Sequence, residues 1–342
     1  MKAMVLERVV SLDKEEQPLV LLDLPDPKPS YGEVLIKVLA CGVCHTELDE
    51  IEGRTPPPVF PMVLGHQIVG EVIELGEGVK KFKIGDIVGI GWIYSSCGKC
   101  EFCKKGLENL CPDFKATGRD AFGGYAEYFV VKEEYAFKIP ESYLPEEAAP
   151  LLCAGAIGYR SLVLSRCVDG NSLGLTGFGG SGHLVLKMVK HKYPNTKVYV
   201  FARDPKQREF AISLGAEWAG DIGENPPELL DSIIDTTPVW RPVVESLKVL
   251  KPGGRLVINA IRKEDSDKDY LLNLDYAEHI WMEKEIKSVA NVTKKDIEEF
   301  LELAGKIPIK PEVQLFSLEE ANKALIELRR GKIKGSKVLK IC

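Results

Sequence analysis

The sequence predicts an α/β protein made of a β-rich domain and a doubly wound parallel sheet. A chain of 342 residues is long enough for about two domains of roughly 150 residues each. Up to about Pro140 it consists of short β-rich runs separated by glycine and proline. After Pro145, strand-length apolar runs alternate with helix-length segments, which is typical of a parallel sheet covered on both faces.

The individual elements follow from these two patterns. Antiparallel strands are predicted at residues 2–6, 19–22, 33–38, 68–75, 86–90 and 125–131. Parallel strands are predicted at 172–176, 197–202, 232–235, 255–260 and 286–290. The tail contains a helix capped by Thr293 with Asp296, a strand near Val313, a helix at 318–330 and a strand at 337–341. Because this tail is too small to fold alone, we expect it to pack on one of the two domains.

Composition excludes several classes of protein. The chain carries 45 Lys and Arg against 51 Asp and Glu, a formal net charge of -6, which argues against nucleic acid as a partner. It has no run of eighteen apolar residues, and residues 1–12 lack the features of a signal peptide. We therefore expect a soluble, cytoplasmic protein that does not bind a membrane.

Four of the nine cysteines have the spacing of a structural metal site. In Cys97-x2-Cys100-x2-Cys103-x7-Cys111, four thiolates could enclose one zinc ion and leave no coordination position open. Disulfides are one alternative. An iron–sulfur cluster is another, but its bacterial spacing puts the fourth cysteine four residues after the third, so zinc is favoured.

Three separate segments, residues 41–46, 65–70 and 151–155, contain cysteines and histidines that suggest a second, open metal site. Two thiolates and one imidazole leave a fourth tetrahedral position free for a substrate oxygen. Each residue also has a simpler interpretation: Cys41 and Cys44 as a redox pair, His66 as a core histidine, and Cys153 as a buried thiol.

A glycine-rich turn between a predicted strand and a predicted helix indicates a Rossmann dinucleotide site. Glycines permit a tight turn and let the backbone approach a pyrophosphate at the helix N-terminus. The turn and the strand residue before it are Thr176, Gly177, Gly179, Gly180, Ser181 and Gly182. The next strand ends at Ala202 and Arg203, and an arginine there favours the 2′-phosphate of NADP. The alternative is NAD, with Asp204 binding the ribose.

Together these residues resemble a zinc-containing alcohol dehydrogenase of the medium-chain dehydrogenase/reductase superfamily. The resemblance covers nearly the whole chain and rests on Cys-Gly-Val-Cys-His-Thr at 41–46, Gly65 and His66, the four-cysteine lobe, Cys153 and the glycine turn. It implies a GroES-like catalytic domain at 1–153 plus 294–342, with a structural zinc lobe at 97–111, around a Rossmann domain at 154–293.

The resemblance also implies roles for single residues and two zinc ions per chain. Cys44, His66 and Cys153 would bind the catalytic zinc, and the lobe cysteines the structural zinc. Thr46 would hydrogen-bond the substrate oxygen, and His45 would face the cofactor pyrophosphate. The cysteines left over are Cys41, Cys167 and Cys342.

The implied reaction is reversible hydride transfer between a primary or secondary alcohol, or an aldehyde, and NADP or NAD, with zinc polarising the substrate oxygen. The alternatives are an NADPH-dependent aldehyde reductase and, from another class, a non-catalytic zinc-binding regulator. A homodimer or homotetramer is expected, with an edge strand near 286–290 at the interface. Trp92, Ile93 and Tyr94 are candidates for an apolar substrate cleft, or for ordinary core packing.

Three residues near the expected catalytic zinc depart from the pattern of many relatives. Glu47 stands in place of Asp and could still orient a zinc-bound imidazole. Gln67 stands in place of Glu, and we hypothesise that this leaves the zinc a stronger Lewis acid. Asp49 stands in place of a proton-relay His, so the proton could instead leave through the cofactor ribose or water.

Overall fold

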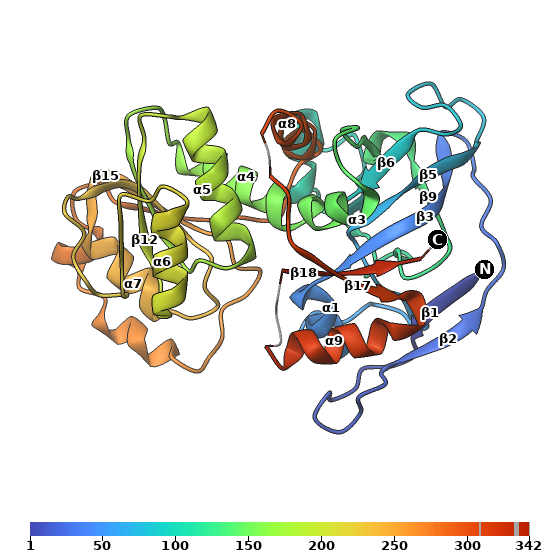
Figure 1. Ribbon diagram of the computed structural model, residues 1–342, viewed down its shortest axis with the longest axis horizontal. Coiled ribbons are helices and arrows are strands. Elements are labelled where there is room, and N and C mark those ends of the chain that lie inside the picture. The colour runs from blue at the N-terminus through green and yellow to red at the C-terminus, as the bar shows by residue number, and fades with distance from the viewer. Residues whose placement is uncertain (308, 332–334, 342) are drawn as a thin grey trace. The chain divides into compact units, whose positions relative to one another are not determined.

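The computed structural model describes residues 1–307, 309–331 and 335–341 (Figure 1). The chain forms two compact units, one composed of Met1–Cys153 and Thr293–Cys342 and the other of Ala154–Val292. The chain thus builds most of the first unit, then the second, and its tail returns to the first. Cys342 lies outside the described residues.

A seven-stranded sheet forms the centre of the first unit. Its order is β10-β6-β5-β3-β18-β17, and β9 also pairs with β3. The strands are β3 Glu33–Val43, β5 Ile68–Leu75, β6 Ile87–Ile90, β9 Tyr128–Lys132, β10 Phe137–Lys138, β17 Val313–Ser317 and β18 Ser336–Lys340. Strand β18 pairs antiparallel with β3, from Lys337 opposite Val43 to Lys340 opposite Ala40. The tail therefore packs on the N-terminal part, as the sequence led us to expect.

Smaller elements complete the first unit. Strands β1 Lys2–Leu6, β2 Leu19–Asp23 and β4 Met62–Val63 form a three-stranded sheet, and β7 Ile93–Ser95 pairs with β8 Lys115–Ala116. The helices are α1 His45–Ile51, α2 Glu101–Lys104, α3 Pro145–Ala148, α8 Lys294–Ala304 and α9 Ala321–Arg329. The predicted cap of α8 is present, because Asp296 N donates to Thr293 Oγ1 at 3.1 Å.

The second unit contains a six-stranded, wholly parallel sheet of order β13-β12-β11-β14-β15-β16. Its strands are β11 Ser172–Thr176, β12 Lys197–Phe201, β13 Trp218–Gly220, β14 Leu230–Asp235, β15 Leu250–Ile258 and β16 Glu285–Ser288, and its helices are α4 Ala154–Ser165, α5 Gly180–Lys192, α6 Pro205–Ser213 and α7 Arg241–Lys248. The chain winds outward from β11 to β13 and then resumes at β14 on the other side of β11. The loops after β11 and β14 therefore meet at a topological switch point, where such sheets bind their ligands.

The predicted α/β fold is confirmed, and the strands differ from the prediction in several places. Strand β3 continues to Val43, five residues beyond the predicted end, because its last residues pair with β18. Strand β15 begins at Leu250, since the Pro252-Gly253-Gly254 run that reads as a turn is carried within the strand. The short strands β4, β7, β8, β10 and β13 were not predicted, because two or three residues are too few to show an alternating pattern.

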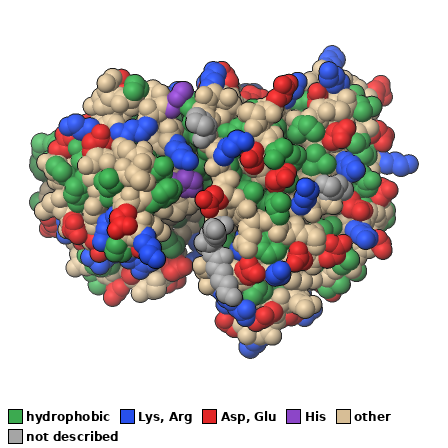
Figure 2. All heavy atoms as spheres, viewed as in Figure 1, with side chains coloured by type: hydrophobic (Ala, Val, Ile, Leu, Met, Phe, Trp, Pro, Cys, Tyr) green, Lys and Arg blue, Asp and Glu red, His purple; other side chains and the backbone are tan. Residues whose placement is uncertain are grey.

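One segment, Pro145–Ser165, is long and apolar enough to cross a membrane, but 67% of its apolar window is buried within the structure. Core helices of globular proteins have the same property. On the face shown in Figure 2, basic and acidic side chains are interspersed over both units. A protein that tracks a phosphate backbone instead gathers its basic residues on one face.

Candidate functional site

Three elements of the first unit bring Cys44, His66 and Cys153 together. Cys44 caps α1 directly after β3, His66 comes two residues before β5, and Cys153 follows the 3-10 turn Ala149–Leu152. The ligand atoms of the three residues all lie within 4.8 Å of one another. The Cys44 Sγ to His66 Nε2 distance is 3.7 Å.

This cluster fits a tetrahedral zinc ion. With Zn–S bonds of about 2.3 Å and Zn–N bonds of about 2.05 Å, tetrahedral angles place the sulfur and nitrogen about 3.6 Å apart. The observed 3.7 Å agrees. Three protein ligands leave the fourth position for a substrate or water oxygen, as in catalytic rather than structural zinc sites.

Glu47 fixes the orientation of His66 and the start of α1. Its Oε1 lies 2.7 Å from His66 Nδ1, and the side-chain exposures are 0% and 2%. Its Oε2 accepts a hydrogen bond from Cys44 N at 2.8 Å. The His66 ring also packs edge-on against Trp92, with 5.0 Å between the ring centroids. Because Nδ1 is held by a carboxylate, Nε2 is the nitrogen left to bind a metal.

The residues that depart from the family pattern are held by specific contacts. Gln67 is buried against Gly42: a Cβ on Gly42 would lie 2.3 Å from Gln67 Oε1, so glycine is needed there. Asp49 is 5% exposed and forms an ion pair with Arg54 Nε. Arg54 also binds Glu52, at 2.8 Å. The structure thus places Asp49 in an ion-pair network at the end of α1.

Cys97, Cys100, Cys103 and Cys111 form a second cluster, with all four sulfurs within 4.8 Å of one another. The Sγ to Sγ distances are 3.9 Å for Cys97–Cys103 and 3.5 Å for Cys100–Cys103. Zinc–thiolate bonds of about 2.3 Å at tetrahedral angles predict about 3.8 Å. A disulfide would require about 2.05 Å, and every cysteine of the described residues is a free thiol. The disulfide alternative is therefore wrong for this lobe.

Backbone amides prepare the lobe for thiolates. Hydrogen bonds from the N–H groups of Lys99 and Cys100 lower the pKa of the Cys97 thiol to about 6. Burial acts in the opposite direction at Cys111 and raises its pKa to about 11. A bound cation would offset that second effect, because a coordinating thiol is deprotonated by the metal.

In the second unit, the glycine turn connects β11 to α5. Gly177 has φ +78°, and a Cβ on Gly182 would lie 2.7 Å from the Gly177 carbonyl oxygen, so both positions require glycine. Around Gly179 and Gly180, by contrast, a Cβ would meet no described atom within 4 Å. The turn is therefore tight at its base and open at the N-terminus of α5, where a phosphate would bind.

The end of β12 shows how the ribose-reading residues are arranged. Asp204 is the N-cap of α6 and accepts a hydrogen bond from Lys206 N at 2.9 Å. Arg208 Nη1 donates to the carbonyl oxygens of Ala202 and Arg203, at 2.8 and 3.1 Å. The Arg203 side chain is exposed. Asp204 is thus engaged in helix capping, while the backbone carrying Arg203 is held in place.

Comparison with known proteins identifies the family of the chain. Residues 30–141 match the alcohol dehydrogenase GroES-like domain. A probable alcohol dehydrogenase of Mycobacterium tuberculosis is 40% identical over 320 residues, which cover 92% of this chain and 90% of that protein. The chain belongs to the zinc-type medium-chain alcohol dehydrogenases. An alcohol dehydrogenase of Geobacillus stearothermophilus is 36% identical over 332 residues, 94% of this chain and 96% of the relative.

Solved structures show the same fold. This alcohol dehydrogenase matches the CAD of Helicobacter pylori complexed with NADP(H), with a TM-score of 0.83, 28% identity and coverage of 99% and 97% of the two chains. It matches a cobalt- and zinc-bound thermostable alcohol dehydrogenase of Pyrobaculum aerophilum with a TM-score of 0.83, 25% identity and 99% coverage of each. The expected family, fold class and enzyme activity are confirmed, and enzymes of this family carry zinc and NAD(P).

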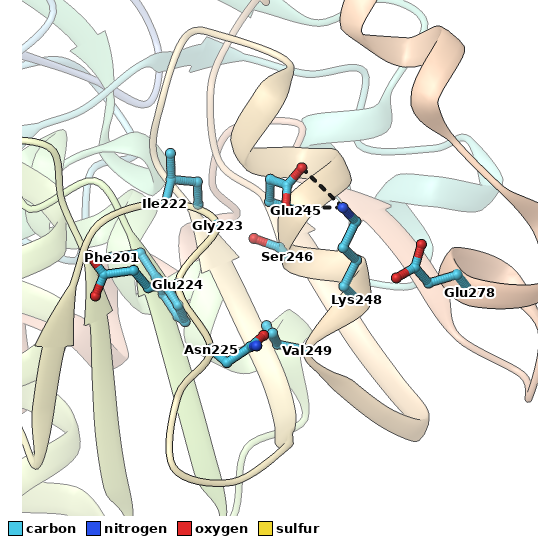
Figure 3. A pocket seen from close by; sticks show the side chains of 10 residues that line it. All are labelled: Phe201, Ile222, Gly223, Glu224, Asn225, Glu245, Ser246, Lys248, Val249 and Glu278. Carbon is cyan, nitrogen blue, oxygen red and sulfur yellow. Dashed lines mark hydrogen bonds and ion pairs between the residues drawn. The ribbon is translucent and has the colours of Figure 1, made fainter.

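A polar pocket of about 270 Å³ lies elsewhere in the second unit of the alcohol dehydrogenase, beside α7 (Figure 3). It is lined by Phe201, Ile222, Gly223, Glu224, Asn225, Glu245, Ser246, Lys248, Val249 and Glu278. Its Glu245 carboxylate is bound by Lys248 Nζ at 3.3 Å and by the Tyr270 hydroxyl at 2.5 Å. The predicted site residues, all of which are described, are not among its lining, so it is separate from the glycine turn.

Proposed function

We propose that Cys44, His66 and Cys153 hold the catalytic zinc of this alcohol dehydrogenase and that the four lobe cysteines hold a structural zinc. The observation that carries the proposal is the convergence of two sulfurs and one imidazole nitrogen, with Glu47 on the other imidazole nitrogen. A structural role alone would not require this incomplete ligand set. We place the catalytic domain at 1–153 plus 294–342 and the Rossmann domain at 154–293.

The chain's own residues have separate roles in the reaction. When bound, zinc polarises the substrate oxygen and the nicotinamide exchanges the hydride with the substrate carbon. The Thr46 hydroxyl accepts the proton of the substrate hydroxyl group and passes it on. Asp49 holds Arg54 and the end of α1, so the proton leaves through the cofactor ribose or water. Reduction of an aldehyde or ketone follows the same path in reverse.

We propose NADP as the preferred cofactor. Arg203 is available for a 2′-phosphate at the end of β12, whereas Asp204 caps α6. The turn from Thr176 to Gly182 would hold the pyrophosphate, and we propose His45 as a further residue that contacts it. NADPH-dependent reduction of an aldehyde is the direction that this cofactor preference favours.

We also propose a cytoplasmic homodimer or homotetramer. Strand β16 is the last strand in the order of the parallel sheet. Ile286 on β16 is 46% exposed, and Trp281 and Met282 just before it are 55% and 53% exposed. An edge strand with exposed apolar side chains can pair with its copy in a second chain.

Metal analysis combined with an alcohol and aldehyde panel tests the proposal. We expect two zinc ions per chain and hydride transfer that is faster with NADP than with NAD at equal concentration. The His66→Ala variant should retain one zinc and lose activity, whereas Cys103→Ser should lose the other zinc. A wild-type protein that is active with neither cofactor, or His66→Ala with both zinc ions retained, would contradict it.

A further inference from the structure

A buried ion pair lies at the carboxyl end of β14, beside the glycine turn. Asp235 is the last residue of β14, and Lys263 comes from the loop after β15. Lys263 Nζ contacts Asp235 Oδ2, and the side-chain exposures are 7% and 0%. Such a pair is costly to bury, so it persists only where its remaining hydrogen-bonding groups are satisfied.

Both members of the pair reach neighbouring loops. Asp235 Oδ1 accepts a hydrogen bond from Thr176 Oγ1 at 2.6 Å. Thr176 is the residue before the glycine turn. Asp235 Oδ1 also accepts from Thr237 Oγ1 at 2.7 Å and Thr237 N at 3.1 Å. Lys263 Nζ donates to the carbonyl oxygens of Thr237 at 2.7 Å and Val239 at 3.0 Å. One pair thus joins the ends of β11, β14 and β15.

The tied loops also touch the phosphate-binding turn directly. Thr236 N donates to Thr176 O at 2.9 Å, and a Cβ on Gly177 would lie 2.8 Å from Thr236 Oγ1. A shift of the loop after β14 would therefore displace the base of the glycine turn. Since β11 and β14 flank the switch point of the sheet, this loop cluster borders the crevice in which a dinucleotide binds.

We propose that the Asp235–Lys263 pair is a positioning device that holds the three crevice loops in their cofactor-binding arrangement before the cofactor arrives. The inference rests on the proposed function, because it assigns the crevice to NADP(H). Loops ordered in advance do not have to be ordered during binding, so the affinity for the dinucleotide is higher. Loss of the pair should therefore weaken cofactor binding.

The same strands provide a control at their opposite end. Asp231, near the start of β14, accepts from Lys251 Nζ at 2.8 Å and from Ser172 N at 2.8 Å. This second pair also joins β11, β14 and β15, and it lies away from the crevice. Lys251→Met therefore removes an ion pair that joins the same three strands, more exposed at 38% and 30%, without touching the crevice loops.

The test measures the dissociation constant for NADPH by fluorescence titration for the wild type, Lys263→Met and Lys251→Met. Hydrogen exchange of residues 236–240 and 259–267 is measured in the same three proteins without cofactor. We expect Lys263→Met to raise the dissociation constant at least tenfold and to speed exchange in these loops. Lys251→Met should stay within twofold of the wild type in both. An unchanged dissociation constant in Lys263→Met, or an equal rise in both variants, overturns the proposal.

A variant that keeps both charges guards against unfolding. Thr237→Val removes one hydrogen bond to Asp235 and should raise the dissociation constant for NADPH several-fold. If Lys263→Met does not fold, an unchanged dissociation constant in Thr237→Val overturns the proposal. If Thr237→Val does not fold either, the pair is a folding element and the inference is wrong. If the wild type binds neither NADPH nor NADH, the proposed function fails and takes the inference with it. If the wild type binds NADPH and the variants bind it with the same dissociation constant, only the inference is refuted.

Discussion

Replacing Glu47 by Gln should weaken the catalytic zinc site without unfolding the first unit. The substitution keeps the size of the side chain but removes the carboxylate that lies 2.7 Å from His66 Nδ1. Its second interaction, with Cys44 N at 2.8 Å, can be kept by the amide oxygen. The substitution therefore tests only the contact between the Glu47 carboxylate and His66 Nδ1, which orients the imidazole.

The expected size of the effect follows from that single lost partner. Groups that hold a metal-bound histidine typically contribute 10- to 100-fold to metal affinity or activity, and a tenfold change corresponds to about 1.4 kcal/mol. We expect the upper part of this range, because both side chains are buried and water cannot replace the carboxylate. Glu47→Asp keeps the charge and should lose less than tenfold.

Zinc release provides the assay. The protein is titrated with a coloured chelator, and the free-zinc concentration at which each of the two ions is lost is recorded. In Glu47→Gln one ion should leave at a 10- to 100-fold higher free-zinc concentration, whereas the ion of the cysteine lobe should leave at the wild-type value. Equal zinc affinity in Glu47→Gln and the wild type, or equal weakening of both ions, would refute the reasoning.

Three further predictions concern the second unit. Arg203→Ala should raise the KM for NADP about 10- to 100-fold, the size expected for a lost charge-assisted hydrogen bond, and leave the KM for NAD unchanged; a parallel rise in both would argue against a 2′-phosphate contact. The hydroxyl of Tyr199 and the ammonium of Lys197 lower the pKa of Glu228 to about 2, so this carboxylate stabilises the fold above about pH 4.5, and that contribution is lost as the pH falls toward 2. Glu228→Gln should lower Tm at pH 7 and much less at pH 2, where half of this carboxylate is protonated in the folded protein. Melting curves that show the same loss at both pH values would contradict this. Burial raises the pKa of Cys167 to about 11, so its thiol should resist a thiol reagent in the native protein at pH 8; peptide mapping that finds it labelled as fast as in denaturant would contradict this.

The candidate metal ligands could be predicted from the sequence, either because they lie close together in the chain or because the residues around them match a family pattern. Cys97, Cys100 and Cys103 are so close in the chain that their sulfurs converge once the loop turns. Cys44, His66 and Cys153 are far apart in the chain, and only the resemblance to a family connected them before the structure brought them together.

The contacts of other site residues were not accessible from sequence. Asp235 and Lys263 are 28 positions apart, and nothing in either segment signals that they meet. Asp49 pairs with Arg54, which follows it across the end of a short helix rather than at helical spacing. The capping role of Asp204 had a signal that was not used: Pro205 follows it, and Asp before Pro commonly starts a helix. Tertiary pairing of this kind depends on which loops the sheet order brings together.

An anomalous-difference map recorded at the zinc absorption edge from crystals of the full chain tests the central claim most directly. The account predicts one peak about 2.3 Å from the sulfurs of Cys44 and Cys153 and about 2.0 Å from His66 Nε2, and a second peak inside the four-cysteine lobe. A map with density only in the lobe, or with Cys44 and Cys153 joined in a disulfide, would contradict it.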